Sequence, residues 1–158
     1  MAPLPRLGKF LLALGVIGLI RLIPEVLQIS KVFHIHAMFF TIDAVLALMT
    51  AAAGEGLRHG KGWAPKLAMR AAGVMLSTSV GMMVFIVHWL TEHRFRMFDP
   101  HVVSRMLYYV LAVAFWPYAV RTVIVAAPEA SRAALKASFI IWLILGIPAA
   151  SILLVVFR

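Results

Sequence analysis

A run of twenty residues without a formal charge, from Ala71 to Leu90, constrains this chain more than any other feature. As an α-helix the run rises about 30 Å, which matches the thickness of the hydrocarbon core of a bilayer. We therefore expect this segment to cross a membrane, and we expect the lipid bilayer to surround the rest of the chain as well.

Small residues recur on one face of this segment. Gly73, Ser77 and Gly81 are each four positions apart, so they share one side of a helix. Arg70 and His88 lie at the two ends of the same stripe. Because small residues let neighbouring membrane helices approach closely, the pattern predicts the central helix of a bundle.

The composition of the whole chain also indicates a membrane protein. Hydrophobic residues make up 63% of it and the mean hydropathy is +0.98, whereas in soluble domains about half of the residues are apolar. The net charge of +9 comes from Lys and Arg that lie mostly at segment ends, where they contact lipid headgroups, so we expect no nucleic acid partner. The absence of cysteine excludes disulfides, thiolate zinc sites and iron–sulfur clusters.

The apolar segments and the breaks between them predict an all-α fold, an integral membrane helical bundle with five transmembrane helices at about 8–28, 32–54, 67–91, 102–126 and 134–157. Together they form a single transmembrane domain over residues 1–158. The stretch GEGLRHGKGWAPK is predicted to be the turn before the third helix. Gly146 and Ala150 form a second close-packing pair, and two such pairs favour a homo-oligomer or a place in a larger membrane complex.

The distribution of Lys and Arg predicts how the chain is oriented. With five crossings, nine of the fifteen basic residues fall on the side of the N-terminus and six on the other side. Because basic residues favour the cytoplasmic side, we expect a cytoplasmic N-terminus in a multi-pass protein of a bacterial inner membrane. Most acidic and histidine side chains then gather at the outer face, among them Glu25, His34, His36, His88 and His93, whereas His59 lies opposite.

Asp43 is the strongest anomaly in the sequence. It follows His34 by nine residues, which places it about 13 Å deeper in the same helix. It follows His36 by seven residues, which places both on one helical face. A carboxylate at this depth is costly unless it is paired, neutral or in contact with water. We therefore expect Asp43 to organise a site.

These groups predict a polar cavity that opens to the outer face, formed by Asp43, His36, His88, Arg21 and Glu25. Imidazoles titrate near neutral pH, and a desolvated carboxyl group holds a proton more readily than one in water. We therefore expect the cavity to pass protons, cations or small solutes. The sequence contains no HExxH and no Gly-x-Ser-x-Gly motif, so it favours a non-enzymatic protein.

Two alternatives remain open from the sequence. In the first, the protein is an accessory or scaffold subunit, and the polar groups only satisfy one another. In the second, His34, His36, His88 and His93 bind a metal, either copper with methionine thioethers or haem b between His36 and His88. Two histidines at a helix entrance are, however, also typical of solvated interfacial side chains.

Overall fold

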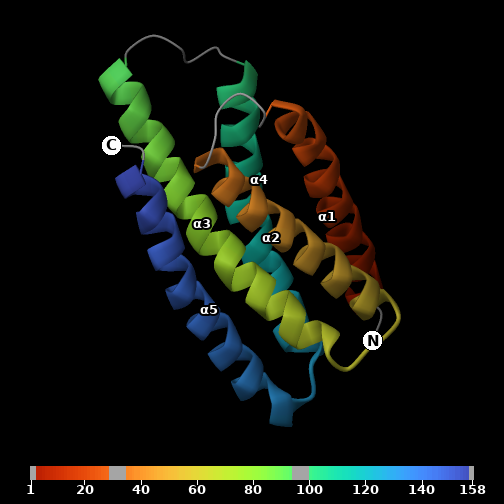
Figure 1. The fold of residues 1–158 in the computed structure, drawn as a ribbon. Coiled ribbons are helices and arrows are strands. Elements are labelled where there is room, and N and C mark those ends of the chain that lie inside the picture. Colours follow the sequence, from red (N-terminus) through yellow and green to blue (C-terminus); the bar gives the residue numbers. More distant parts are fainter. Residues whose placement is uncertain (1–2, 29–34, 94–99, 157–158) are drawn as a thin grey trace.

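The computed structural model describes the backbone of residues 3–28, 35–93 and 100–156. These residues form five α-helices (Figure 1), which are α1 Pro3–Gln28, α2 Ile35–Arg58, α3 Ala64–His93, α4 Pro100–Ala126 and α5 Glu129–Val156. No strand occurs in this part of the chain. The predicted all-α fold with five helices is thus confirmed.

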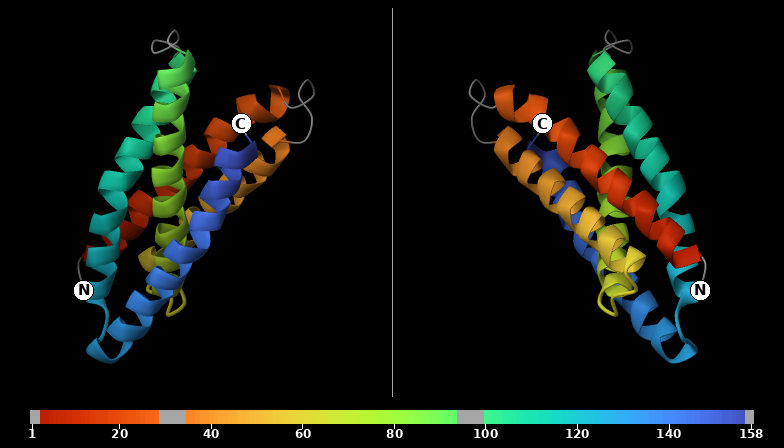
Figure 2. Two further views of the ribbon diagram at one scale, coloured as in Figure 1. Left: turned by 90° about the vertical axis from the view of Figure 1, so that its left-hand side faces the viewer. Right: turned by 90° about the vertical axis from the view of Figure 1, so that its right-hand side faces the viewer.

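The helices run alternately up and down, and α3 lies in the middle of the bundle (Figure 1). It packs against α2, α4 and α5, whereas α1 packs mainly against α2. The expectation that the uncharged segment forms the central helix is therefore confirmed. Figure 2 shows that α1 and α4 lie close together near the N-terminus and diverge towards the other end of the bundle.

Glycines bring the backbones of α1 and α2 into direct contact. A Cβ atom on Gly15 would lie 2.5 Å from the amide nitrogen of Ala51. A Cβ atom on Gly8 would lie 2.7 Å from the carbonyl oxygen of Gly54. Any larger residue at these positions would push the helices apart, because the opposing atoms belong to the backbone. This glycine interface was not predicted from the sequence.

A second close approach joins α3 to α5. A Cβ atom on Gly73 would lie 2.8 Å from the amide nitrogen of Leu143, and one on Gly146 would collide with Ser77 Oγ. The face of α3 that carries Gly73 and Ser77 is therefore turned to α5. This agrees with the predicted packing role of Gly73, Ser77 and Gly146, whereas the side chain of Ala150 lies outside the described residues.

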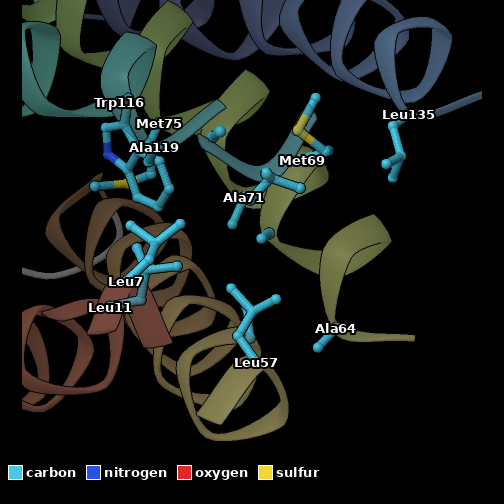
Figure 3. Packing of buried hydrophobic residues seen from close by; sticks show 14 of the residues in the cluster. Leu7, Leu11, Leu57, Ala64, Met69, Ala71, Met75, Trp116, Ala119 and Leu135 are labelled. Atoms are coloured by element: carbon cyan, nitrogen blue, oxygen red, sulfur yellow. The ribbon is translucent and has the colours of Figure 1, made fainter. Parts of the chain in front are cut away.

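The largest side chain of the core is Trp116 of α4, which is 1% exposed. Its ring lies beside Leu7 and Leu11 of α1 and near Met75 of α3 (Figure 3). Trp116 thus fills the space between α1, α3 and α4 in the half of the bundle where α1 and α4 lie close together. Its neighbour Pro117 lies within α4.

The turn between α2 and α3 is shorter than the sequence predicted. Gly54 and Gly56 belong to α2, which continues to Arg58. A Cβ atom on Gly56 would meet the ring of Trp63 at 2.7 Å, so glycine is used here for close packing and not for a turn. The chain reverses at Gly60, whose φ of +65° favours glycine.

The first and last helices also begin earlier than expected, at Pro3 and Glu129. Ser131 stabilises the start of α5, because its Oγ donates a hydrogen bond to the carbonyl oxygen of Pro128 at 2.8 Å. Arg132 donates from Nε to the carbonyl oxygen of Ala127 at 3.1 Å, which satisfies a free carbonyl at the end of α4.

Three of the described helices are long and apolar enough to cross a membrane, over Ala64–Val84, Leu107–Ala126 and Glu129–Pro148. This defines the chain as a helical protein with candidate membrane spans. Five crossings were predicted, and α1 and α2 fall outside this group within the described residues. Both helices nevertheless contain long apolar stretches, in which Arg21 is the only charged residue between Phe10 and Ile23 of α1 and Asp43 is the only one between Ile35 and Gly54 of α2, so their crossing of a membrane stays a prediction.

Candidate functional site

Arg21 of α1 stacks on Tyr108 of α4. The guanidinium carbon Cζ lies 4.8 Å from the centroid of the phenol ring, which is within the range of a cation–π interaction. The ring of Tyr108 also meets the ring of Tyr109 edge to face, with centroids 5.5 Å apart. Arg21 thereby joins two helices that make few other contacts.

Asp43 of α2 is the third member of this group. Its carboxylate and the Arg21 guanidinium both act electrostatically on the Tyr108 hydroxyl. Asp43 and Arg21 are half-buried, so water screens their charges less than it would at the protein surface. We name these three residues the Arg21–Asp43–Tyr108 cluster. It brings together side chains from three helices that are far apart in the sequence.

A groove between α1 and α4 starts at this cluster. We name it the α1–α4 groove, and its volume is about 440 Å³. Its lining is almost wholly apolar and consists of Phe10, Ala13, Leu14 and Ile17 of α1 with Tyr108, Leu111, Ala112 and Phe115 of α4. Phe10, Ile17 and Leu111 are exposed, so the groove opens to the outside of the bundle.

Two polar groups in the interior lack a hydrogen bond partner among the described residues. They are Ser79 Oγ on α3 and Trp116 Nε1 on α4, and both are fully buried. The neighbouring hydroxyls behave differently, since Ser77 and Thr78 donate to the carbonyl oxygens of Gly73 and Val74 of their own helix. Buried polar groups are usually paired, so Ser79 Oγ and Trp116 Nε1 each retain the capacity for one more hydrogen bond partner.

The opposite end of α2 carries a separate, exposed ion pair. Glu55 Oε1 lies 2.8 Å from His59 Nε2, and Glu55 Oε2 lies 3.4 Å from Arg58 Nη1. About half of each of these side chains is exposed. Surface pairs of this kind contribute little to stability. A substitution of Glu55 is therefore a suitable control for a substitution in the Arg21–Asp43–Tyr108 cluster.

The predicted cavity residues are described only in part. Arg21 and Asp43 both contribute to the cluster. The side chains of Glu25, His36 and His88 lie outside the described residues. The helix ends that carry these three residues, the last turn of α1, the first turn of α2 and the last turns of α3, lie at the same end of the bundle in Figure 1.

The candidate metal ligands also lie outside the described part of the structure. This holds for the whole of His34 and for the side chains of His36, His88 and His93. The described side chains include no group of three or more His, Cys, Asp or Glu that could hold a metal ion. The copper and haem hypotheses therefore stay predictions.

Tyr108 was not among the predicted site residues. Tyr108 and Tyr109 follow each other in the first third of α4, and aromatic residues near helix ends are also typical of a membrane interface. Nothing in that pattern shows that α1 lies beside α4, and only this neighbourhood brings Arg21 to the ring. The aromatic residue type of Tyr108 is visible in the sequence, whereas its contact with Arg21 depends on how α1 and α4 pack.

The fold and the cluster define an all-α helical bundle with candidate membrane spans and a charged cluster at the junction of three helices. Comparisons with protein families, with curated proteins and with solved structures find no match. The function must therefore be argued from the geometry alone.

Proposed function

We propose that this protein is a five-span integral membrane protein that passes protons, cations or small polar solutes across a bacterial inner membrane, with its N-terminus in the cytoplasm. In this proposal α1 and α2 cross the bilayer together with the three more apolar helices. The observation that carries the proposal is the Arg21–Asp43–Tyr108 cluster, which joins α1, α2 and α4.

The cluster explains how two charged residues can be accommodated in lipid. An isolated carboxylate or guanidinium in a membrane is costly, and such residues face the bundle interior and pair with other groups. Charged groups inside membrane proteins commonly mark the route of an ion or a proton. Asp43 is half-buried between helices, so we assign it the role of the group that takes up and releases the transported species.

Polar groups deeper in the bundle support a route inwards from the cluster. Trp116 follows Tyr108 by eight residues on α4, which is about 12 Å along the helix. Ser79 Oγ on α3 and Trp116 Nε1 are both buried without a partner in the described residues. A polar guest or water would satisfy these groups, because a water in a buried polar site bonds to groups that are otherwise unpaired.

Flux measurements in proteoliposomes test this function. We expect Asp43→Asn to lower the flux of protons, followed with an entrapped pH dye, by at least about tenfold, because the amide cannot take up a proton. If the cargo is another cation, the same variant should lower that flux in an ion-selective assay. The matched control is Glu55→Gln, a carboxylate of the same helix that lies in the exposed ion pair.

The two variants separate transport from general damage to the protein. We expect Glu55→Gln to keep the wild-type flux, and both variants should elute as the wild-type protein does in detergent. Unchanged flux in Asp43→Asn would remove Asp43 from the route. An equal loss in both variants would show that the effect is not specific to the cluster.

A second function, that of an accessory subunit, is favoured by the outer surface of α5. This helix packs mainly against α3, and its other side exposes a strip of large apolar residues that includes Ile140, Ile141 and Ile144. Such a strip faces lipid or another membrane helix. Purification from native membranes in mild detergent distinguishes the two, since an accessory subunit brings other proteins with it in a fixed ratio.

A further inference from the structure

We propose that the α1–α4 groove binds one acyl chain of an anionic phospholipid, with the lipid phosphate held at Arg21. The inference rests on the five-span arrangement proposed above, because α1 must lie in the bilayer for a lipid to enter the groove. It adds a ligand site that the transport proposal does not require.

The shape of the groove suits the acyl chain of a lipid. On α1 the lining residues Phe10, Leu14 and Ile17 follow one helical face, and Arg21 is the next position on that face. On α4 Leu111 and Phe115 continue from Tyr108 in the same way. The groove is therefore a strip of apolar side chains with a guanidinium at one end.

The volume and the lining point to the same ligand. About 440 Å³ lies within the usual size of small-molecule pockets, and such pockets are mainly apolar with a few polar groups that fix orientation. In this groove the polar group of the lining is Tyr108, beside Arg21. A ligand that matches this distribution has a long apolar part and one polar end.

The position of Arg21 fits the headgroup of a lipid. Arg21 lies seven residues before the end of α1 at Gln28, and Tyr108 lies eight residues after the start of α4 at Pro100, so the stacked guanidinium lies near the same end of both helices. From there the groove runs towards the middle of α4, to Phe115. A lipid that enters from its own leaflet would keep its phosphate at this end and place its acyl chain along the groove.

Arg21 can hold a phosphate without leaving Tyr108. Stacking uses the face of the guanidinium, whereas its five N–H donors lie in the plane and point outwards. Basic groups between membrane helices recognise anionic headgroups, and the net charge of +9 favours an anionic lipid over a zwitterionic one.

Photocrosslinking with lipids of defined headgroup tests the site. The full chain is reconstituted in vesicles that contain phosphatidylglycerol or phosphatidylcholine with a photoreactive diazirine in the acyl chain, and the labelled residues are mapped by mass spectrometry. We expect groove residues such as Leu14 and Leu111 to be labelled about tenfold more by phosphatidylglycerol, which corresponds to one charge-assisted hydrogen bond. The outward residues Ile140 and Ile144 should be labelled equally by both.

Three variants show whether the headgroup and the groove act as proposed. Arg21→Gln should reduce groove labelling by phosphatidylglycerol to the level seen with phosphatidylcholine, whereas Arg121→Gln, an exposed arginine farther along α4, should leave it unchanged. Leu111→Trp should fill the groove and reduce labelling by both lipids while the ion flux stays at the wild-type level. The lipid site and the ion route can therefore fail separately.

Two results would overturn the lipid site. Equal labelling of the groove by both lipids would show only the general lipid that surrounds any membrane protein. Occupation by a second copy of the chain would appear as a disulfide-linked dimer of Leu111→Cys under mild oxidation. This second measurement is clear because the natural chain contains no cysteine, and it does not depend on how well Leu111→Trp folds.

Discussion

Gly8 and Gly54 lie against each other's backbone at the contact between α1 and α2. A Cβ atom on Gly8 would be 2.7 Å from the carbonyl oxygen of Gly54, and one on Gly54 would be 2.7 Å from the carbonyl oxygen of Gly8. This reciprocal contact fixes how close α1 comes to α2. It therefore also fixes where Arg21 and Asp43, which lie farther along the same two helices, are held.

Adding a single methyl group at this contact should destabilise the protein. Gly54→Ala would place a Cβ atom against the backbone nitrogen of Leu12, and backbone atoms cannot move aside as a flexible side chain can. We expect a loss of about 1–3 kcal/mol in the free energy of unfolding, although alanine favours helices by about 1 kcal/mol over glycine. The measurement is unfolding in mixed micelles, monitored by circular dichroism.

The control for this prediction is Gly62→Ala in the turn between α2 and α3. No atom lies within 4 Å of a Cβ built on Gly62, so this substitution should leave the stability nearly unchanged. A Gly54→Ala protein as stable as the control would mean that α1 and α2 are farther apart than described here.

The contact between α3 and α5 should show coupling between Ser77 and Gly146. Gly146→Ala places a Cβ atom onto Ser77 Oγ, and Ser77 would then lose its hydrogen bond to the carbonyl oxygen of Gly73, which is worth about 1 kcal/mol. Ser77→Ala in the same chain removes the colliding oxygen and should restore part of the stability. A double-mutant cycle measures this coupling, and strictly additive effects would argue against the contact.

Substitutions of Tyr108 should separate its ring from its hydroxyl. Tyr108→Phe keeps the face on which Arg21 stacks, so the free energy of unfolding should change little. Tyr108→Leu removes the aromatic face and should cost about 1 kcal/mol beyond the change in packing. If the two variants are equally stable, the stacking contributes nothing measurable to the junction of α1 and α4.

The transport proposal predicts a protein without a bound haem or copper ion. Purified protein should show no Soret absorption, and elemental analysis should find less than one copper per chain. A Soret band or one copper ion per chain would instead favour the hypothesis in which His36 and His88, with His34 and His93, are ligands. In that event His36→Ala and His88→Ala should each remove the absorption or the metal.

The general architecture could be predicted from the sequence because it depends on local pattern. The uncharged run that contains Gly73 and Ser77 indicates both a long helix and its packed face. The ends of α2 could not be predicted in this way, because Gly54 and Gly56 have the composition of a turn and are used for close contact. The sequence shows that Gly54 and Gly56 are small, but it does not show which residues of other segments lie against them.

Of the residues in the candidate site, only the two charged ones could be predicted from the sequence. Asp43 and Arg21 stand out because each is a charge in an apolar segment. Tyr108 and the α1–α4 groove depend on which helices are neighbours, and helical periodicity contains no information on that point. The same is true of Gly8 and Gly15, whose role follows from α2 lying beside α1.

The most direct test of the account is whether α2, which follows α1 and carries Asp43, crosses the membrane. Because the chain contains no cysteine, single cysteines can be placed at Ser30, between these helices, and at Gly62, after α2, and labelled from either side with a membrane-impermeant maleimide. The account predicts that Ser30→Cys reacts only from outside and Gly62→Cys only from the cytoplasm. Reaction of both from the same side would contradict it, because α2 would then not cross the bilayer and Asp43 could not lie on a route through it.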